Sequence, residues 1–391
     1  MLHLLSNAEL YDPDPRGRSH LLVAGETIVW IGAERPSLPA SLPVEETDVG
    51  GRRLIPGLID GHVHLTGGGG EAGPHTRVPP LGLSRLTAGG ITTAIGVLGT
   101  DDLVRTPAEL VTVARGVIAE GLSAWCFTGG YHVPPATVTG SVRGDLVLVD
   151  LVLGVGELAI SDHRSSQPTL DELLRVAGDA HVGGLMSGKA GILHLHVGDG
   201  SRGLEPVREM LDRSELPAAM FHPTHVNRRK ALFDEALELA ARGCTIDITA
   251  FPVEEGEDAW SATAALVRYL DAGLPPARVT VSSDAGGCFP VFDRDGRVTS
   301  MDVGRPAALA GTLQQLLACG LPLERVLPAF TSNVAQLLLL GRKGRVTAGA
   351  DADLVVLDGE GGVADVMARG QWHVRDGRSV IRGTFERIER W

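Results

Sequence analysis

The sequence predicts an α/β fold, a (β/α)₈ barrel of the TIM type with a small β domain attached, and two observations lead to it. Through the middle of the chain, apolar β-rich runs alternate with stretches of helical period, a pattern typical of parallel α/β folds. Both chain ends instead contain short strands separated by Asp/Gly turns, and neither end has enough apolar residues to fold alone. With 391 residues, the chain has room for one barrel and one small added domain.

Eight apolar runs supply the predicted barrel strands. They cover residues 58–65, 91–99, 122–130, 156–163, 191–199, 218–226, 245–251 and 279–287. Helical patterns fill several of the intervals and follow the last strand, at 106–121, 227–243 and 305–320. An open, doubly wound sheet is the alternative, but no GxGxxG follows the first strand, so the barrel is preferred.

The two chain ends are expected to pair into one small domain. Residues 20–33 read as a hairpin, because two apolar runs flank Gly25-Glu26. The tail alternates short apolar strands with Asp/Gly turns. We therefore predict a small domain from residues 1–56 and 345–391, and a barrel from residues 57–344.

The composition narrows the possible partners and the compartment. The net charge is −13 and the chain has three lysines, Lys189, Lys230 and Lys343, which argues against nucleic acid as a partner. An acidic substrate would need local arginines to overcome this field. The four cysteines form no CxxC pair, and the N-terminus shows neither a signal peptide nor a membrane span. A cytoplasmic protein with no membrane partner is expected.

Histidines and carboxylates recur at the C-terminal ends of the predicted strands, where barrel enzymes carry their active sites. His62 and His64 are two residues apart and so lie on the same side of the first strand. The other candidates are Glu157, Asp162, His163, Arg164, His194, His196, His222, His225 and Asp284. A single histidine in a strand is more often packed or exposed, but this repeated register predicts a site for zinc or a similar divalent ion.

Several motifs carry a family resemblance. PGLIDGHVHL, DAGG and KGRVTAGADADLVVLD resemble the amidohydrolase superfamily, metal-dependent hydrolases with a barrel and a small β-sandwich built from both chain ends. HVHLTGGGGEAGP, GLSRLTAGGITT, TGGYHVP, TGSVRGD, ISDHRS and PTHVNR resemble the isoaspartyl dipeptidases within it. The resemblance covers nearly the whole chain and also implies a homo-oligomer.

The resemblance implies two zinc ions and assigns their ligands. His62 and His64 would bind the more buried ion, and His196 and His225 the second. Asp284 would bind the first ion and act as the general base and acid.

One position departs from the family pattern. Glu157 occupies the place where the family has a lysine carbamylated by CO₂, whose carbamate bridges the metals. A glutamate has the same charge and two oxygens, so we expect Glu157 to bridge the two ions without carbamylation. The alternative is a local misalignment and a single metal ion. His194 and His222 are expected to be hydrogen-bonded neighbours of the ligands.

The resemblance also implies the substrate contacts. Glu71 would bind the α-ammonium group of an isoaspartyl dipeptide, while Arg164 and Arg228 would bind its carboxylates. Tyr131 would polarise the scissile carbonyl, although a loop aromatic that covers the barrel mouth is the alternative. The remaining contacts would come from Thr100, the amides of residues 67–70 including Gly69, and Cys288, which replaces a serine.

The predicted function is therefore metal-dependent hydrolysis of the β-aspartyl bond of isoaspartyl dipeptides. A hydantoinase-like or dihydroorotase-like hydrolase of cyclic amides is one alternative, since it would keep the metal ligands but not need Glu71 with Arg164 and Arg228. A non-catalytic barrel scaffold is the other alternative, against which the intact ligand set argues.

Overall fold

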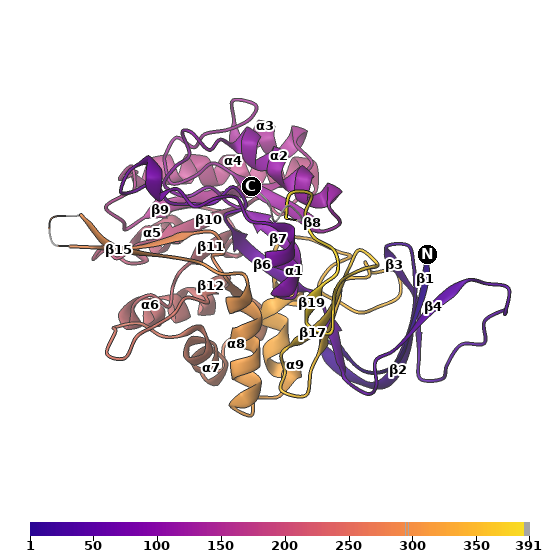
Figure 1. Ribbon diagram of the computed structural model, residues 1–391. Coiled ribbons are helices and arrows are strands. Elements are labelled where there is room, and N and C mark those ends of the chain that lie inside the picture. Colours follow the sequence, from indigo (N-terminus) through magenta and orange to yellow (C-terminus); the bar gives the residue numbers. More distant parts are fainter. Residues whose placement is uncertain (294, 296, 387–391) are drawn as a thin grey trace.

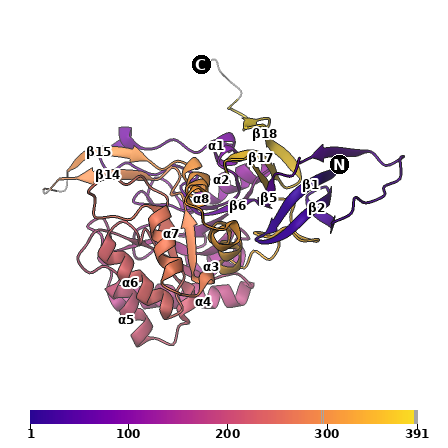
Figure 2. The same ribbon diagram turned by 90° about the horizontal axis from the view of Figure 1, so that it is seen from below.

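The computed structural model describes residues 1–293, 295 and 297–386. It has two lobes, a larger α/β lobe and a β-rich lobe that contains the N-terminus (Figures 1 and 2). The fold is that of an α/β barrel with a separate β-rich domain contributed by the two ends of the chain, as the sequence predicts.

Eight parallel strands form the barrel. They are β6 (Leu58–Val63), β7 (Ile91–Gly96), β8 (Ser123–Thr128), β9 (Val152–Ile160), β10 (Ile192–Val197), β11 (Phe221–Thr224), β12 (Ile246–Thr249) and β13 (Val279–Ser282). Strands β6 to β11 form one continuous ladder, and β12 pairs with β13. The circle is closed by His64 N, which donates to Ala285 O at 2.8 Å, and Val226 N, which donates to Asp247 O at 3.4 Å. The carboxyl ends of all eight strands therefore meet at one rim.

The fourth barrel strand differs from the sequence prediction. It begins at Val152 rather than at residue 156, so Glu157 lies in its second half and close to the rim. The early part contains Gly154 and Gly156, which hide the β pattern in the sequence. Both glycines face the next strand without room for a side chain: a Cβ on Gly154 would lie 2.5 Å from Ile192 O.

Helices surround the barrel. They are α1 (Leu83–Ala88), α2 (Pro107–Ala119), α3 (Val142–Leu148), α4 (Leu170–Ser187), α5 (Glu205–Arg213), α6 (Lys230–Ala241), α7 (Ala262–Asp271), α8 (Ala307–Ala318), α9 (Leu323–Val326) and α10 (Ser332–Leu337). Local sequence explains where several begin. Thr106 caps α2 by accepting from Glu109 N, and Thr169 with Glu172 forms a capping box on α4.

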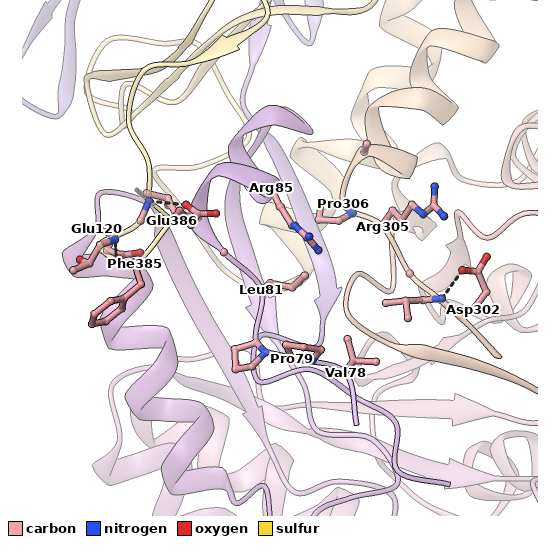
Figure 3. A pocket seen from close by; sticks show the side chains of 18 residues that line it. Val78, Pro79, Leu81, Arg85, Glu120, Asp302, Arg305, Pro306, Phe385 and Glu386 are labelled. Carbon is pink, nitrogen blue, oxygen red and sulfur yellow. Dashed lines mark hydrogen bonds between the residues drawn. The ribbon is translucent and has the colours of Figure 1, made fainter. Parts of the chain in front are cut away.

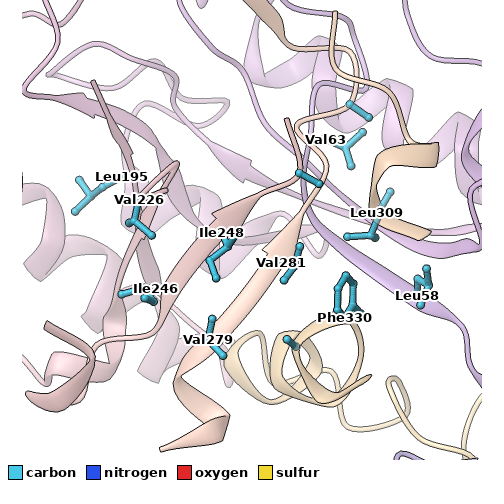
Figure 4. Close-up of a cluster of buried hydrophobic side chains, with 14 of the residues drawn as sticks. Leu58, Val63, Leu195, Val226, Ile246, Ile248, Val279, Val281, Leu309 and Phe330 are labelled. Atoms are coloured by element: carbon cyan, nitrogen blue, oxygen red, sulfur yellow. The ribbon is translucent and has the colours of Figure 1, made fainter. Parts of the chain in front are cut away.

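Apolar side chains from the strands and the surrounding helices form the main core. Figure 4 shows one part of it, in which Val279 and Val281 of β13 lie near Phe330, and Leu309 of α8 lies near Val63. The residues labelled in Figure 4 are all 0% exposed, so this side of the rim rests on a closely packed base.

The β-rich lobe is one sheet of nine strands. They are β1 (Leu2–Asp12), β2 (Asp14–Ala24), β3 (Thr27–Gly32), β4 (Val44–Asp48), β5 (Arg53–Pro56), β16 (Leu354–Leu357), β17 (Val363–Ala368), β18 (Gln371–Arg375) and β19 (Arg378–Ser379). Strand β5 joins the two chain ends, because it pairs with β1 and with β16. The predicted hairpin is present, with Ala24 opposite Thr27. In the described residues the strands form one continuous ladder rather than two separate sheets.

The last described residues return to the barrel rather than to the sheet. The carboxylate of Glu386 accepts from the backbone N and hydroxyl of Ser84 on α1, and Thr384 N donates to Glu120. The tail forms one wall of a groove of about 1010 Å³, which Arg85 and Arg305 also line (Figure 3). Residues 387–391 of the predicted small domain lie outside the described residues.

A buried lysine connects the barrel to the β-rich lobe, and its loss is expected to destabilise the protein. Lys343 is 6% exposed, and its ammonium group lies 2.6 Å from Asp353 and from Ser123 of β8. Lys343→Met would leave the buried Asp353 carboxylate without its cation, which costs about 3 kcal/mol. Arg342→Met is the matched control, because Arg342 is exposed where it pairs with Asp351. Urea unfolding should show the large loss for Lys343→Met, and equal losses would contradict this role.

Candidate metal centre and active site

Six predicted metal ligands meet at the barrel rim. All six are buried and come from β6, β9, β10 and the residues that follow β6, β11 and β13: His62, His64, Glu157, His196, His225 and Asp284. His225 and Asp284 have positive φ angles of 63° and 50°, which are uncommon outside glycine. Such backbone strain concentrates at functional sites, where the surrounding structure holds it.

The carboxylate of Glu157 faces four histidines and divides them into two pairs. Its Oε1 lies 3.6 Å from His62 Nε2 and 3.4 Å from His64 Nε2. Its Oε2 lies 3.1 Å from His196 Nδ1 and 3.4 Å from His225 Nε2. Each oxygen therefore belongs to a different pair of imidazoles, which is the arrangement of a carboxylate between two cation positions.

The carboxylate of Asp284 lies next to the first histidine pair, His62 and His64. Its Oδ1 lies 3.4 Å from His62 Nε2 and 3.1 Å from His64 Nε2. Yet His62 Nε2 and Asp284 Oδ1 are buried without a hydrogen-bond partner among the described residues. Buried polar atoms are seldom left unpaired, and ligand atoms of His62, His64 and Asp284 lie close enough together to share one ion.

The electrostatics of the cluster favour a positive charge. Burial raises the pKa of Glu157, but the charge of His62 and hydrogen bonds from His196 and His225 outweigh this and hold it well below its usual range. Burial likewise raises the pKa of Asp284, and His62 and His64 hold it below its usual range. Two ionised carboxylates among imidazoles are a suitable donor set for zinc, so the residues present fit a metal ion.

The chain's three lysines are engaged elsewhere. Lys189 donates to Leu146 O and Val149 O, Lys230 lies over the ring of Trp260, and Lys343 pairs with Asp353. None of the three lysines therefore lies between the two histidine pairs, where the carboxylate of Glu157 lies instead.

Glu71, Thr100 and Arg164 lie together beside the cluster of candidate metal ligands. Thr100 Oγ1 donates to Glu71 Oε1 at 3.0 Å, and Arg164 Nη1 lies 3.5 Å from the same oxygen. Glu71 Oε2 is buried and has no hydrogen bond within the described part of the chain. A buried carboxylate oxygen without a donor is suited to bind an ammonium group.

Asp162, one of the candidates at the strand ends, is neither a predicted metal ligand nor a predicted substrate contact, yet it lies between the two. Its carboxylate lies 3.0 Å from His196 Nε2 and accepts from Arg164 Nη2 at 2.7 Å. Burial raises the pKa of Asp162, but hydrogen bonds from His196 and Arg164 bring it far below its usual value. It therefore orients a candidate ligand and a candidate substrate residue together. Its place two residues before Arg164 in ISDHRS was the available signal.

Tyr131 and Arg228 border the second histidine pair. The hydroxyl of Tyr131 lies 2.8 Å from His196 Nδ1, and burial raises the tyrosine pKa well above 10, so the hydroxyl keeps its proton. Arg228 Nη1 donates to Val197 O and lies 3.4 Å from His196 Nε2. Both polar groups therefore lie against the ring of His196, one at each ring nitrogen.

Backbone hydrogen bonds hold the glycine-rich loop of residues 67–70 in place. Gly67 N donates to His64 O and Gly68 N to Gly286 O, so these two amides are used within the protein, unlike the prediction that they bind substrate. Gly69 has φ +79°, and a Cβ there would lie 2.5 Å from Thr76 O and 3.5 Å from Cys288.

Burial raises the pKa of Cys288 to about 11, so its side chain is a neutral thiol. The buried guanidinium of Arg105 donates to Gly68 O.

The hairpin β14 (Cys288–Phe292) and β15 (Val298–Val303) projects from the barrel beside the site (Figure 1). The ring of Phe292 contacts that of His163 edge-on, at 4.7 Å between centroids, and lies 5.6 Å from the Arg164 guanidinium. Neither contact was foreseen from the sequence. The groove of Figure 3 is a different place, since none of the predicted site residues lines it.

Comparisons with known proteins agree with the fold and with the family resemblance. Residues 53–373 match the model of the amidohydrolase family. The crystal structure of β-aspartyl dipeptidase from Fervidobacterium islandicum, in complex with the dipeptide β-Asp-Leu, is 40% identical in sequence. It covers 97% of this chain and 98% of that chain with a TM-score of 0.90.

Curated relatives are more distant. The dihydroorotase of Anaplasma phagocytophilum is 26% identical over 90% of this chain and 85% of that protein. The imidazolonepropionase of an Arthrobacter species is 32% identical, but the match spans only 40% of this chain and 39% of that protein. Separately, the structure shows, among its described residues, no helix long and apolar enough to cross a membrane.

Proposed function

Because the chain belongs to the amidohydrolase family, we propose that it is a metal-dependent dipeptidase that hydrolyses the β-aspartyl bond of isoaspartyl dipeptides. The observation that carries the substrate class is the buried Glu71 Oε2, which lies beside Arg164 and Thr100 and has no donor among the described residues. The likeness to a β-aspartyl dipeptidase over 97% of this chain supports the same assignment.

We propose that two divalent ions, zinc by preference, bind on either side of Glu157. His62, His64 and Asp284 would hold one, and His196 and His225 the other, with one Glu157 oxygen toward each. When bound, two such ions supply a water molecule activated for attack on an amide carbonyl. Because Glu157 is ionised without modification, the site needs no CO₂.

The neighbouring residues bind the two ends of the substrate. Glu71 accepts hydrogen bonds from the α-ammonium group through Oε2, and Arg164 donates to a carboxylate while Asp162 keeps its guanidinium oriented. Arg228 donates to the second carboxylate. These three contacts place the side-chain amide of the aspartyl residue over the metal cluster.

Asp284 and Tyr131 move and hold protons in the reaction. Asp284, ionised at neutral pH, accepts a proton from the attacking water and returns it to the leaving amine. Tyr131 keeps its proton and donates a hydrogen bond to the carbonyl oxygen as negative charge develops on it.

The substrate class is tested with three compounds on the zinc-loaded protein. We expect hydrolysis of β-aspartyl-leucine, with kcat/KM at least about 100-fold above that for α-aspartyl-leucine, because the α isomer misplaces its carboxylate by one carbon. Dihydroorotate has no ammonium group for Glu71, and we expect no turnover. If dihydroorotate were the only one of the three compounds to be hydrolysed, the result would instead support a cyclic-amide hydrolase, the activity suggested by the name of the dihydroorotase relative.

A further inference from the structure

A row of buried polar side chains runs from the metal cluster to Asp247 on β12. His62 Nδ1 lies 2.8 Å from His194 Nε2, and His194 Nδ1 lies 2.9 Å from His222 Nδ1. His222 Nε2 lies 3.1 Å from Thr280 Oγ1, whose hydroxyl donates to Asp247 Oδ1 at 2.6 Å. Each of the five residues is 0–2% exposed, so bulk water offers no alternative partners along the row.

The carboxylate at the far end has several donors. Besides Thr280, the hydroxyls of Thr224 and Ser282 donate to its Oδ2 at 2.7 and 2.6 Å. All three of these hydroxyl groups donate, and the carboxylate oxygens of Asp247 accept. The hydroxyl proton of Thr280 is therefore directed toward Asp247, and its oxygen is free to accept from His222.

This end determines the direction of every hydrogen bond in the row. A neutral imidazole has one N–H and one acceptor nitrogen, and burial, which lowers the pKa of His222 to about 4, keeps that ring neutral. His222 donates from Nε2 to Thr280, so its Nδ1 accepts from His194. His194 donates from Nδ1, so its Nε2 accepts from His62 Nδ1. With Nδ1 of His62 committed as a donor, Nε2, the atom that faces Glu157 and Asp284, is the nitrogen that would lose its proton to bind a metal ion.

We propose that Asp247, acting through Thr280, His222 and His194, is a positioning residue that holds His62 in the tautomer required to bind a metal ion. When an imidazole donates a hydrogen bond toward a carboxylate, directly or through a row of such bonds, its other ring nitrogen becomes more basic. The proposal rests on the metal role of His62 within the proposed function, but not on the identity of the substrate.

Two threonines provide a matched test. Thr280→Val and Thr224→Val each remove one buried hydroxyl that donates to Asp247, but only Thr280 belongs to the row. We expect Thr280→Val to raise the zinc dissociation constant about 10- to 100-fold, the usual effect of losing an indirect partner of a ligand. Thr224→Val should stay within about twofold of the wild type. Competition with a chelator measures both, and Thr280→Ser should restore the affinity.

Equal changes in zinc affinity for the two valine variants would overturn the proposal. A measurement on the wild type covers the case in which Thr280→Val does not fold. Long-range ¹⁵N–¹H NMR of the zinc-loaded, ¹⁵N-histidine-labelled protein should show the proton of His194 on Nδ1 and that of His222 on Nε2. The opposite nitrogen on either ring would overturn it. If the wild-type protein has these tautomers but cleaves no β-aspartyl peptide, the proposed substrate is contradicted, whereas the proposed role of Asp247 is supported.

Discussion

Asp284→Asn is expected to lower kcat for β-aspartyl-leucine by about 10³-fold, within the range for loss of a positioned general base. The amide cannot accept a proton at neutral pH, whereas the carboxylate is held ionised by His62 and His64 despite its burial. The shape of the side chain is nearly unchanged, so the packing at the rim should persist. Steady-state kinetics with zinc in excess measure this loss, and metal analysis shows how much zinc the variant still holds.

Asp302→Asn is the control for the substitution itself. Asp302 lies on β15, is exposed, and its Oδ1 accepts only from Val303 N among the described residues. Its kcat should match that of the wild type. If Asp284→Asn retained more than about a tenth of wild-type kcat with zinc in excess, another group would have to be the base.

Glu157→Gln is expected to lower both the affinity for zinc and the activity by more than about 100-fold, since losing even an indirect partner of a metal ligand costs 10- to 100-fold in affinity or activity. The two carboxylate oxygens face different histidine pairs, so a neutral amide should weaken both of the proposed metal positions at once. Mass spectrometry of metal in dialysed protein gives the zinc content, and hydrolysis of β-aspartyl-leucine gives the activity.

Removal of CO₂ separates a glutamate bridge from a carbamate bridge. Activity of the wild type should be the same in bicarbonate-free buffer and in buffer with added bicarbonate, because Glu157 already carries its charge. A dependence on bicarbonate would require a carbamylated lysine and contradict the assignment of Glu157. A variant Glu157→Gln that kept two zinc ions would contradict it independently.

Much of the fold was predictable because barrel strands have a local signal. The run that contains His62 is apolar and short, and helix α2 follows a threonine cap that is visible in the sequence. The start of β9 was missed, since two of its residues, Gly154 and Gly156, have no β preference of their own and are selected by contact with β10. The course of the tail to Ser84 depends likewise on a contact between distant residues.

The sequence by itself determined the types of donor and their order along the chain: the His62–His64 pair, the later histidines, and a glutamate where a lysine was expected. The tertiary structure decided which atoms meet. Closure of the barrel divides the oxygens of Glu157 between two histidine pairs and brings His194 to His62 across 132 residues of chain. Residue type and periodicity are local properties of the chain, whereas a hydrogen bond of 2.8 Å depends on the packing of every strand between its partners.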